Sequence, residues 1–177
     1  MSLRDLHLLG SPVLREACKP VKTVDDETRR FIVDLFETMY AAKGVGLAAN
    51  QVGVARRVAV IDAEGARFVM INPRIVEASG EDSAEEGCLS VPDVFAEVSR
   101  PDRVVLEATD ENGQVYRREL EGLPARAVQH EIDHLDGILF LDHLSPLKRK
   151  RILAKWKKEH ADEGYTRPVK PAPAVSS

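Results

Sequence analysis

Apolar residues spaced three and four apart predict three helices. They recur in this way through residues 25–43, and Gly44 follows where a left-handed C-cap would lie. A second helical pattern begins at Pro124 and ends before Gly137, and proline near the start with glycine past the end is the usual asymmetry of helix termini. The Ser-Pro pair at 145–146 predicts the start of a third helix, in which a narrow apolar stripe faces many basic residues.

Short β-type runs lie between the first two helices. The glycine-rich stretch 44–53 predicts a tight loop where something approaches the backbone, and the acidic stretch 81–86 predicts a connector. Asn72-Pro73 should stop the second run. The runs predicted as strands are 57–62, 68–71, 95–99, 103–109 and 114–120, with the last two joined as a hairpin by the turn at 110–113.

This order of elements predicts an α+β fold and not alternating βαβ units. We expect short, mostly antiparallel strands packed around a central metal-binding helix, with an N-terminal and a C-terminal helix. The length of 177 residues fits one catalytic domain over residues 1–166. Prolines and small residues over 167–177 predict a disordered tail.

Composition narrows the class of protein. The net charge of −4 gives no basic excess, which disfavours a dedicated DNA or RNA binder and favours a small or peptide substrate. The chain has 2 cysteines, too few for a disulfide framework, and it contains no apolar run long enough to span a membrane. We therefore expect a cytoplasmic protein, with an organellar origin after removal of a transit peptide as the minor alternative.

The segment His130-Glu131-Ile132-Asp133-His134 carries the most chemical information. Histidines at positions i and i+4 of a helix project from one face, so both can bind one metal ion. The glutamate between them would then act as the general base for a metal-bound water. The alternative is an amphipathic helix whose two histidines only pack in the core.

The third ligand must come from elsewhere in the chain. His143 lies past the helix end, and Glu159 stands among lysines where a solvated ion pair is the better account. Cys88 follows an acidic pair that would disfavour a thiolate, and a metal ion would resolve this conflict. Alternatively, Cys88 is a small buried residue, or it forms a closed stabilising site with Cys18 and the two histidines, which would leave the glutamate without a role.

Three segments together resemble the signature motifs of the peptide deformylase family, in the family's order and spacing. Shorter similarities near residues 12–15 and 142–146 extend the resemblance over most of the chain up to about residue 158. The motif segments are Gly44-Val45-Gly46-Leu47-Ala48-Ala49-Asn50-Gln51, Glu86-Gly87-Cys88-Leu89-Ser90 and Gln129-His130-Glu131-Ile132-Asp133-His134-Leu135-Asp136-Gly137.

The resemblance implies removal of the formyl group from N-formylmethionine on newly made polypeptides, with release of formate. It implies one divalent metal held by Cys88, His130 and His134, usually Fe²⁺, which Zn²⁺, Ni²⁺ or Co²⁺ can replace. By the same resemblance, a metal-bound water attacks the formyl carbon while Glu131 takes its proton and passes a proton to the leaving amine. The Gln51 amide and the Leu89 backbone N–H would stabilise the oxyanion.

The resemblance also implies a substrate cleft in which an extended peptide lies against the glycine-rich segment as an added strand. The residues expected to line it, around an apolar pocket for methionine that His130 also borders, are Gly44, Val45, Gly46, Gly87, Leu123 and Ala127. Arg126 departs from the apolar residue expected at its position. We expect its side chain to reach solvent, with a head at the pocket mouth touching the peptide or a carboxylate as the alternative.

The remaining expectations concern supporting residues and partners. Glu86 is expected to pair with Arg100 behind Cys88, Asp133 to be either an acceptor beside the site or a surface residue, and Cys18 to lie in the core. The basic C-terminal helix could contact ribosomal RNA or be only a solvated face. The alternative functions are a general zinc endopeptidase and a metal-stabilised binding module.

Overall fold

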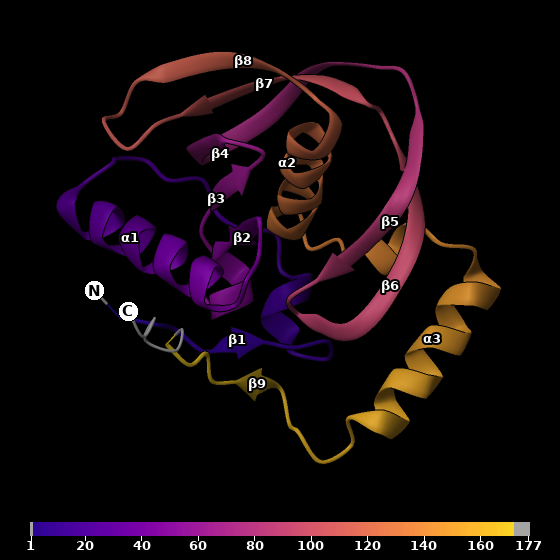
Figure 1. Cartoon of the computed structure of the whole chain (residues 1–177). Coiled ribbons are helices and arrows are strands. Elements are labelled where there is room, and N and C mark those ends of the chain that lie inside the picture. Colours follow the sequence, from indigo (N-terminus) through magenta and orange to yellow (C-terminus); the bar gives the residue numbers. More distant parts are fainter. Residues whose placement is uncertain (1, 172–177) are drawn as a thin grey trace, which may run out of the picture.

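The computed structural model describes residues 2–171 (Figure 1). Three α-helices occur in this part of the chain, together with short 3₁₀ turns and strands in three small sheets. The helices are α1 (Asp26–Ala41), α2 (Gly122–Leu135) and α3 (Pro146–Glu159), and the 3₁₀ turns are η1 (Pro12–Arg15), η2 (Ala49–Val52) and η3 (Phe140–His143). The strands are β1 (Leu6–His7), β2 (Gly46–Ala48), β3 (Val58–Ala63), β4 (Ala66–Ser79), β5 (Asp82–Cys88), β6 (Val91–Arg100), β7 (Arg103–Thr109), β8 (Val115–Glu121) and β9 (Thr166–Arg167).

The strands surround α2, as Figure 1 shows. Five of them form an antiparallel sheet in the order β2-β3-β4-β7-β8, in which β2 is an edge strand. The antiparallel hairpin β5-β6 passes the other side of α2, and α1 lies at one side of the molecule. The predicted α+β fold with a central helix is therefore confirmed.

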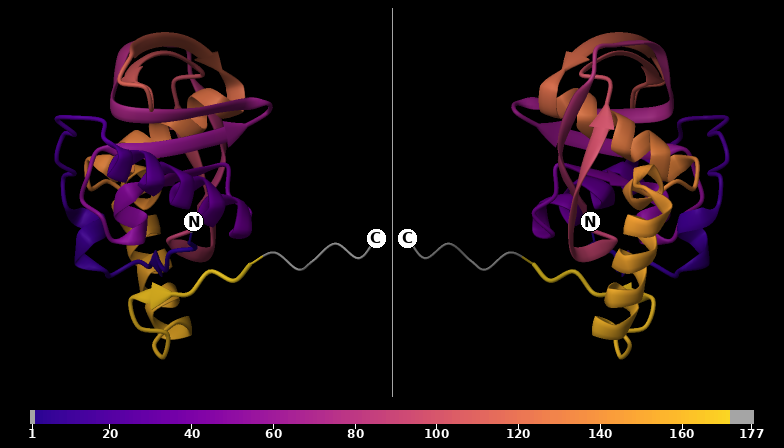
Figure 2. Two further views of the ribbon diagram at one scale, coloured as in Figure 1. Left: turned by 90° about the vertical axis from the view of Figure 1, so that its left-hand side faces the viewer. Right: turned by 90° about the vertical axis from the view of Figure 1, so that its right-hand side faces the viewer.

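Three apolar clusters hold these layers together. The first joins α1 to β2, β3 and β4, and the second packs the inner face of α2 against the main sheet. Cys18 belongs to the second cluster, as expected for a core residue. The third attaches α3 to the β5-β6 hairpin and η3 through Trp156, which is 5% exposed. The views in Figure 2 place α3 along the outside of the molecule.

Capping residues fix the helix ends near their predicted positions. The Asp25 carboxylate accepts a hydrogen bond from the Thr28 N–H at 2.8 Å and caps α1, and the Ser145 hydroxyl caps α3 in the same way. The predicted left-handed cap at Gly44 is wrong, because Lys43 takes the positive φ, 61°. Glycine is favoured at position 44 for a steric reason instead, since a Cβ there would lie 2.7 Å from the Leu89 side chain.

Three predictions between the helices are wrong. Residues 44–53 form β2 and η2 instead of a loop, because small side chains let this strand pass close to α2. The acidic stretch 81–86 is mostly β5, whose backbone pairs with β6. The second strand does not stop at Asn72-Pro73, since β4 continues to Ser79. Its pairing with β7 is irregular between Ile71 and Arg74, and this irregularity accommodates the proline, which has no N–H to donate to the neighbouring strand.

The chain after α3 returns to the first strand. Leu6 pairs with Arg167 in the β1-β9 ladder, so the first residue of the expected tail belongs to a strand. Residues 172–177 lie outside the described part of the chain, and their disorder stays a prediction. No helix within residues 2–171 is both long and apolar enough to cross a membrane.

Candidate metal centre and active site

Two elements bring the three expected metal ligands together. One turn of α2 separates His130 from His134, and the end of β5 places Cys88 opposite them. The Cys88 Sγ lies 3.2 Å from His134 Nε2, which in turn lies 3.2 Å from His130 Nε2. All three ligand atoms lie within 4.8 Å of one another, a spacing that suits one shared ion.

The surroundings of the two histidines shift their pKa values in opposite directions. Burial lowers the pKa of His134 well below its usual value, which keeps the imidazole in the neutral form that binds metals. Burial also opposes a charge on His130, but the Cys88 sulfur and the Glu86 carboxylate raise its pKa. One sulfur and two imidazole nitrogens form a donor set that suits Fe²⁺, Zn²⁺, Ni²⁺ or Co²⁺.

Glu131 lies beside the cluster with one free carboxylate oxygen. The residue is 4% exposed, and its Oε1 has no hydrogen-bond partner within residues 2–171. Burial raises its pKa to about 7, the range in which a carboxylate can both accept and return a proton at neutral pH. Gly46 of β2 packs against this carboxylate, because a Cβ there would lie 2.6 Å from Oε2.

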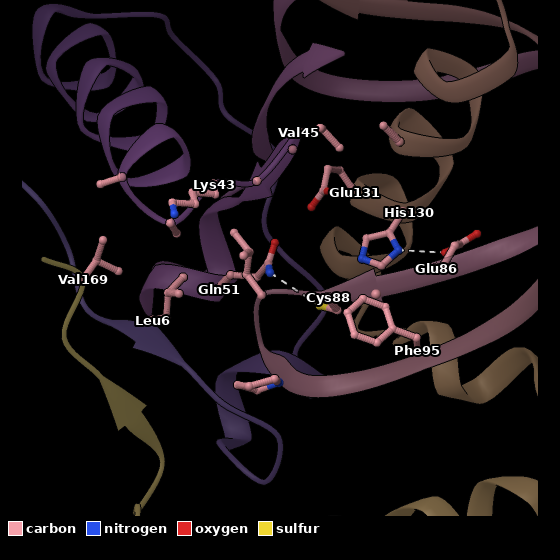
Figure 3. Close-up of a pocket in the computed structure, with 18 of the residues that line it drawn as sticks. Leu6, Lys43, Val45, Gln51, Glu86, Cys88, Phe95, His130, Glu131 and Val169 are labelled. Carbon is pink, nitrogen blue, oxygen red and sulfur yellow. Dashed lines mark hydrogen bonds and ion pairs between the residues drawn. The ribbon is translucent and has the colours of Figure 1, made fainter. Parts of the chain in front are cut away.

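The Gln51 side chain points toward the cluster from η2 (Figure 3). Its Oε1 accepts a hydrogen bond from the Ala48 N–H at 2.9 Å, which fixes which end of the amide faces the site. Its Nε2 donates to Ser90 Oγ at 3.1 Å and lies 3.7 Å from Cys88 Sγ. The Gln51 amide hydrogens are thus held next to the expected metal position. The other expected donor, the Leu89 backbone N–H, belongs to the residue directly after Cys88.

A cleft of about 720 Å³ opens over these groups. Figure 3 shows Val45 and Glu131 on one side of it, and His130 and Phe95 on another. Every residue expected to bind substrate lines this cleft, namely Gly44, Val45, Gly46, Gly87, Leu123 and Ala127. The catalytic candidates Glu131, Gln51 and Leu89 line it together with the candidate ligands Cys88 and His130, while His134 is fully buried behind them.

A buried ion-pair network supports the cluster from behind. Glu86 Oε1 lies 2.9 Å from His130 Nδ1, and Arg100 donates to both oxygens of the same carboxylate at 2.6 and 3.0 Å, as expected. Burial alone would raise the pKa of Glu86, but the hydrogen bonds from His130 and Arg100 lower it to about 2. Asp133 accepts from Arg100 at 2.9 Å and contacts His143, so it is an acceptor that connects to His130 only through Arg100 and Glu86.

Comparison with known proteins agrees with this arrangement. The family model described as polypeptide deformylase matches residues 3–150. The chain belongs to the peptide deformylase family. Among curated relatives, the peptide deformylase of Alkalilimnicola ehrlichii is 51% identical over 162 residues, which cover 89% of this chain and 91% of the relative.

Solved structures of the family share the fold. A peptide deformylase from Legionella pneumophila has a TM-score of 0.84 at 45% identity and covers 92% of this chain and 99% of its own. The peptide deformylase from Ehrlichia chaffeensis in complex with actinonin has a TM-score of 0.86 at 39% identity and covers 90% and 98%. The fold that carries the site is therefore that of the family.

Arg126 behaves differently from the sequence-based expectation. Its side chain does not reach solvent, since the residue is 8% exposed. Its guanidinium does contact carboxylates, as the alternative held, but they belong to the protein itself: buried Glu86 at 2.5 Å and exposed Asp82 at 3.4 Å. The prediction failed because the partners lie 28 to 44 residues away in sequence and meet Arg126 only in the folded chain.

Some lining residues were missed by sequence reasoning. Pro92 and Phe95 of β6 border the cleft, and Phe95 remains 65% exposed. The segment Arg167–Lys170, assigned to the tail, also lines it on the side of Leu6. Phe95 could have been predicted to line the cleft, because it is an aromatic residue in a predicted strand. No pattern in the local sequence indicates that the C-terminal segment returns to the cleft.

Proposed function

We propose that this protein removes the formyl group from the N-formylmethionine that begins new polypeptides and releases formate. The observation that carries the proposal is that Cys88, His130, Glu131 and Gln51 line one cleft, with His134 completing the cluster directly behind them. Membership of the peptide deformylase family supports it. Because the substrate is the nascent chain, we place this activity in the cytoplasm.

The proposed metal ligands are Cys88 Sγ, His130 Nε2 and His134 Nε2. The divalent ion, when bound there, supplies Lewis-acid chemistry that lowers the pKa of a water and polarises the formyl oxygen. We propose Fe²⁺ as the native ion, with Zn²⁺, Ni²⁺ or Co²⁺ as substitutes, since a thiolate with two imidazoles accepts all of them.

Glu131 is proposed to move the proton. Its free oxygen accepts a proton from the attacking water as the new C–O bond forms, and the raised pKa lets it deliver that proton to the amide nitrogen as the C–N bond breaks. The products are formate and a free methionine amine. The Gln51 Nε2–H and the Leu89 N–H are proposed as donors to the oxyanion that forms in between.

The peptide is proposed to lie along β2. This strand is at the edge of the main sheet and borders the cleft, so an extended chain can pair with its free backbone groups. The methionine side chain would then enter the pocket beside Leu123 and Ala127, with Gly44, Val45, Gly46 and Gly87 contacting the peptide backbone.

The substrate assignment is tested with three substrates and the Fe²⁺-loaded protein purified without oxygen. We expect formate from an N-formyl-Met tripeptide, no acetate from the matched N-acetyl-Met tripeptide and no cleavage of casein. Digestion of casein together with inactivity on the formyl peptide would instead support the endopeptidase alternative.

Contact between α3 and the ribosome is a further part of the proposal. Seven basic residues lie on this helix: Lys148, Arg149, Lys150, Arg151, Lys155, Lys157 and Lys158. Deleting the helix would also remove buried Trp156, so charge reversal is the cleaner test. We expect the double variant Lys150→Glu, Lys157→Glu to lose co-sedimentation with ribosomes and the control Arg30→Glu on α1 to retain it. Unchanged co-sedimentation of the double variant would refute the contact.

A further inference from the structure

Arg126 forms a second clamp on the carboxylate that supports His130. Its NH1 donates to Glu86 Oε2 at 2.5 Å, the oxygen that also accepts from Arg100 Nε at 2.6 Å. The other oxygen, Oε1, contacts His130 Nδ1 and accepts from Arg100 NH2. Both oxygens of Glu86 therefore have two hydrogen-bond partners each, and the carboxylate has little freedom to rotate away from His130.

The same guanidinium ties the β5-β6 hairpin to α2. Arg126 NH1 donates to the Val98 carbonyl at 2.8 Å, and NH2 donates to the Asp82 carbonyl at 2.6 Å. These carbonyls belong to β6 and β5 respectively, and Arg126 itself lies on α2, one turn before His130. Because β5 ends at Cys88, this contact holds the strand of one ligand against the helix of the other two.

The stem of Arg126 has a separate role in the cleft. Arg126 lines the cleft beside Leu123 and Ala127, yet its side chain is only 10% exposed. Since the head is engaged with Glu86 and two carbonyls, the methylene groups are what the cleft can contact. An arginine can thus occupy a position where an apolar side chain is expected, because its stem supplies the apolar surface and its head is paired elsewhere.

We propose that Arg126 is a positioning residue that holds the metal ligands in place through Glu86 and the β5-β6 hairpin. This inference rests on the proposed metal site and deepens it. Partners of metal ligands typically change metal affinity or activity about 10- to 100-fold when they are removed. Arg126 acts through Glu86, so we expect an effect of roughly tenfold, at the lower end of that range.

The test compares Co²⁺-loaded variants for metal release to a chelator, measured by loss of the thiolate–cobalt absorption. We expect Arg126→Met to release cobalt roughly tenfold faster and to lose a similar factor in kcat. The KM for the formyl peptide should change by less than about threefold, because methionine keeps the length of the stem. Arg126→Lys should fall between Arg126→Met and the unchanged protein, because it keeps the charge without the fork of donors. Arg103→Met serves as the control, since Arg103 on β7 pairs with Glu119 on β8.

Each outcome of this test either supports or overturns the proposed role of Arg126. Cobalt release and kcat of Arg126→Met equal to those of the unchanged protein would overturn the proposal, as would an effect confined to KM. If Arg126→Met fails to fold, Arg126→Lys takes its place with the same criterion, and failure of both to fold would assign Arg126 a structural role instead. The release measurement does not need turnover, so a missing deformylase activity in the unchanged protein would contradict the proposed function without touching this inference.

Discussion

A methyl group on Gly46 would press directly against Glu131. An ideal Cβ at Gly46 lies 2.6 Å from Glu131 Oε2 and 3.0 Å from its Cγ and Cδ. The φ of Gly46 lies outside the left-handed region, so alanine meets no backbone strain there. Because Oε2 is the far end of a flexible side chain that lines the cleft, the contact is relieved by displacement of the Glu131 carboxylate.

This displacement should appear in the chemical step. Moving a reacting group by about 1 Å can cost about 10²-fold in rate, which corresponds to about 2.7 kcal/mol in the barrier. We therefore expect Gly46→Ala to lower kcat for an N-formyl-Met tripeptide about 100-fold while leaving the bound metal in place. The assay is steady-state formate release, with metal content and thermal unfolding measured on the same samples.

Gly65→Ala is the matched control. Gly65 lies in the turn between β3 and β4 at φ +83°, and a Cβ there has nothing within 4 Å. Alanine at that position should cost about 1 kcal/mol in the free energy of unfolding and leave kcat unchanged. A Gly46→Ala variant with normal kcat, or one that loses activity only in step with its metal, would refute the reasoning.

Three further predictions follow from the same contacts. Gln51→Glu removes the amide donor and should lower kcat about 10²- to 10³-fold in steady-state assays at unchanged metal content. Burial alone would raise the pKa of Asp142, but Arg15 and the Leu139 N–H lower it below its value in the unfolded chain. The ionised carboxylate therefore stabilises the fold at pH values above the pKa of the unfolded chain. This stability is lost as the pH falls through the lower pKa of the folded protein. In denaturant titrations, Asp142→Asn should therefore be less stable at pH 7, by no more than about 1 kcal/mol after solvent screening, and should approach the unchanged protein near pH 2. Chelation should abolish activity and lower the Tm, with both restored by added Ni²⁺; an unaffected Tm would contradict a metal site built into the fold.

Local patterns were enough to predict the helices and half of the site. Histidines four residues apart on a helix face one point regardless of the rest of the fold, so spacing alone makes His130, Glu131 and His134 candidates, with packing in the core as the alternative. The 103–120 hairpin was likewise predicted from its turn and its alternating residues. The third candidate ligand could not be chosen from the residues alone, because only the fold brings Cys88 beside α2.

Long-range partners explain what could not be predicted. The acidic side chains of residues 81–86 predict a solvent-exposed connector. Glu86 is instead 6% exposed, since Arg100, Arg126 and His130 converge on it from two other elements. The return of residues 166–170 to the cleft depends in the same way on pairing with β1.

Formate release from an N-formyl-Met tripeptide, with Glu131→Gln measured beside the unchanged protein, is the most direct test of the proposed activity and of the proton carrier. Both should be loaded with Fe²⁺ without oxygen and matched in metal content. We predict turnover by the unchanged protein and a loss of about 10²- to 10⁴-fold in the variant, which keeps its fold and its metal. Equal turnover by the two proteins, or none by the correctly loaded unchanged protein, would contradict the account.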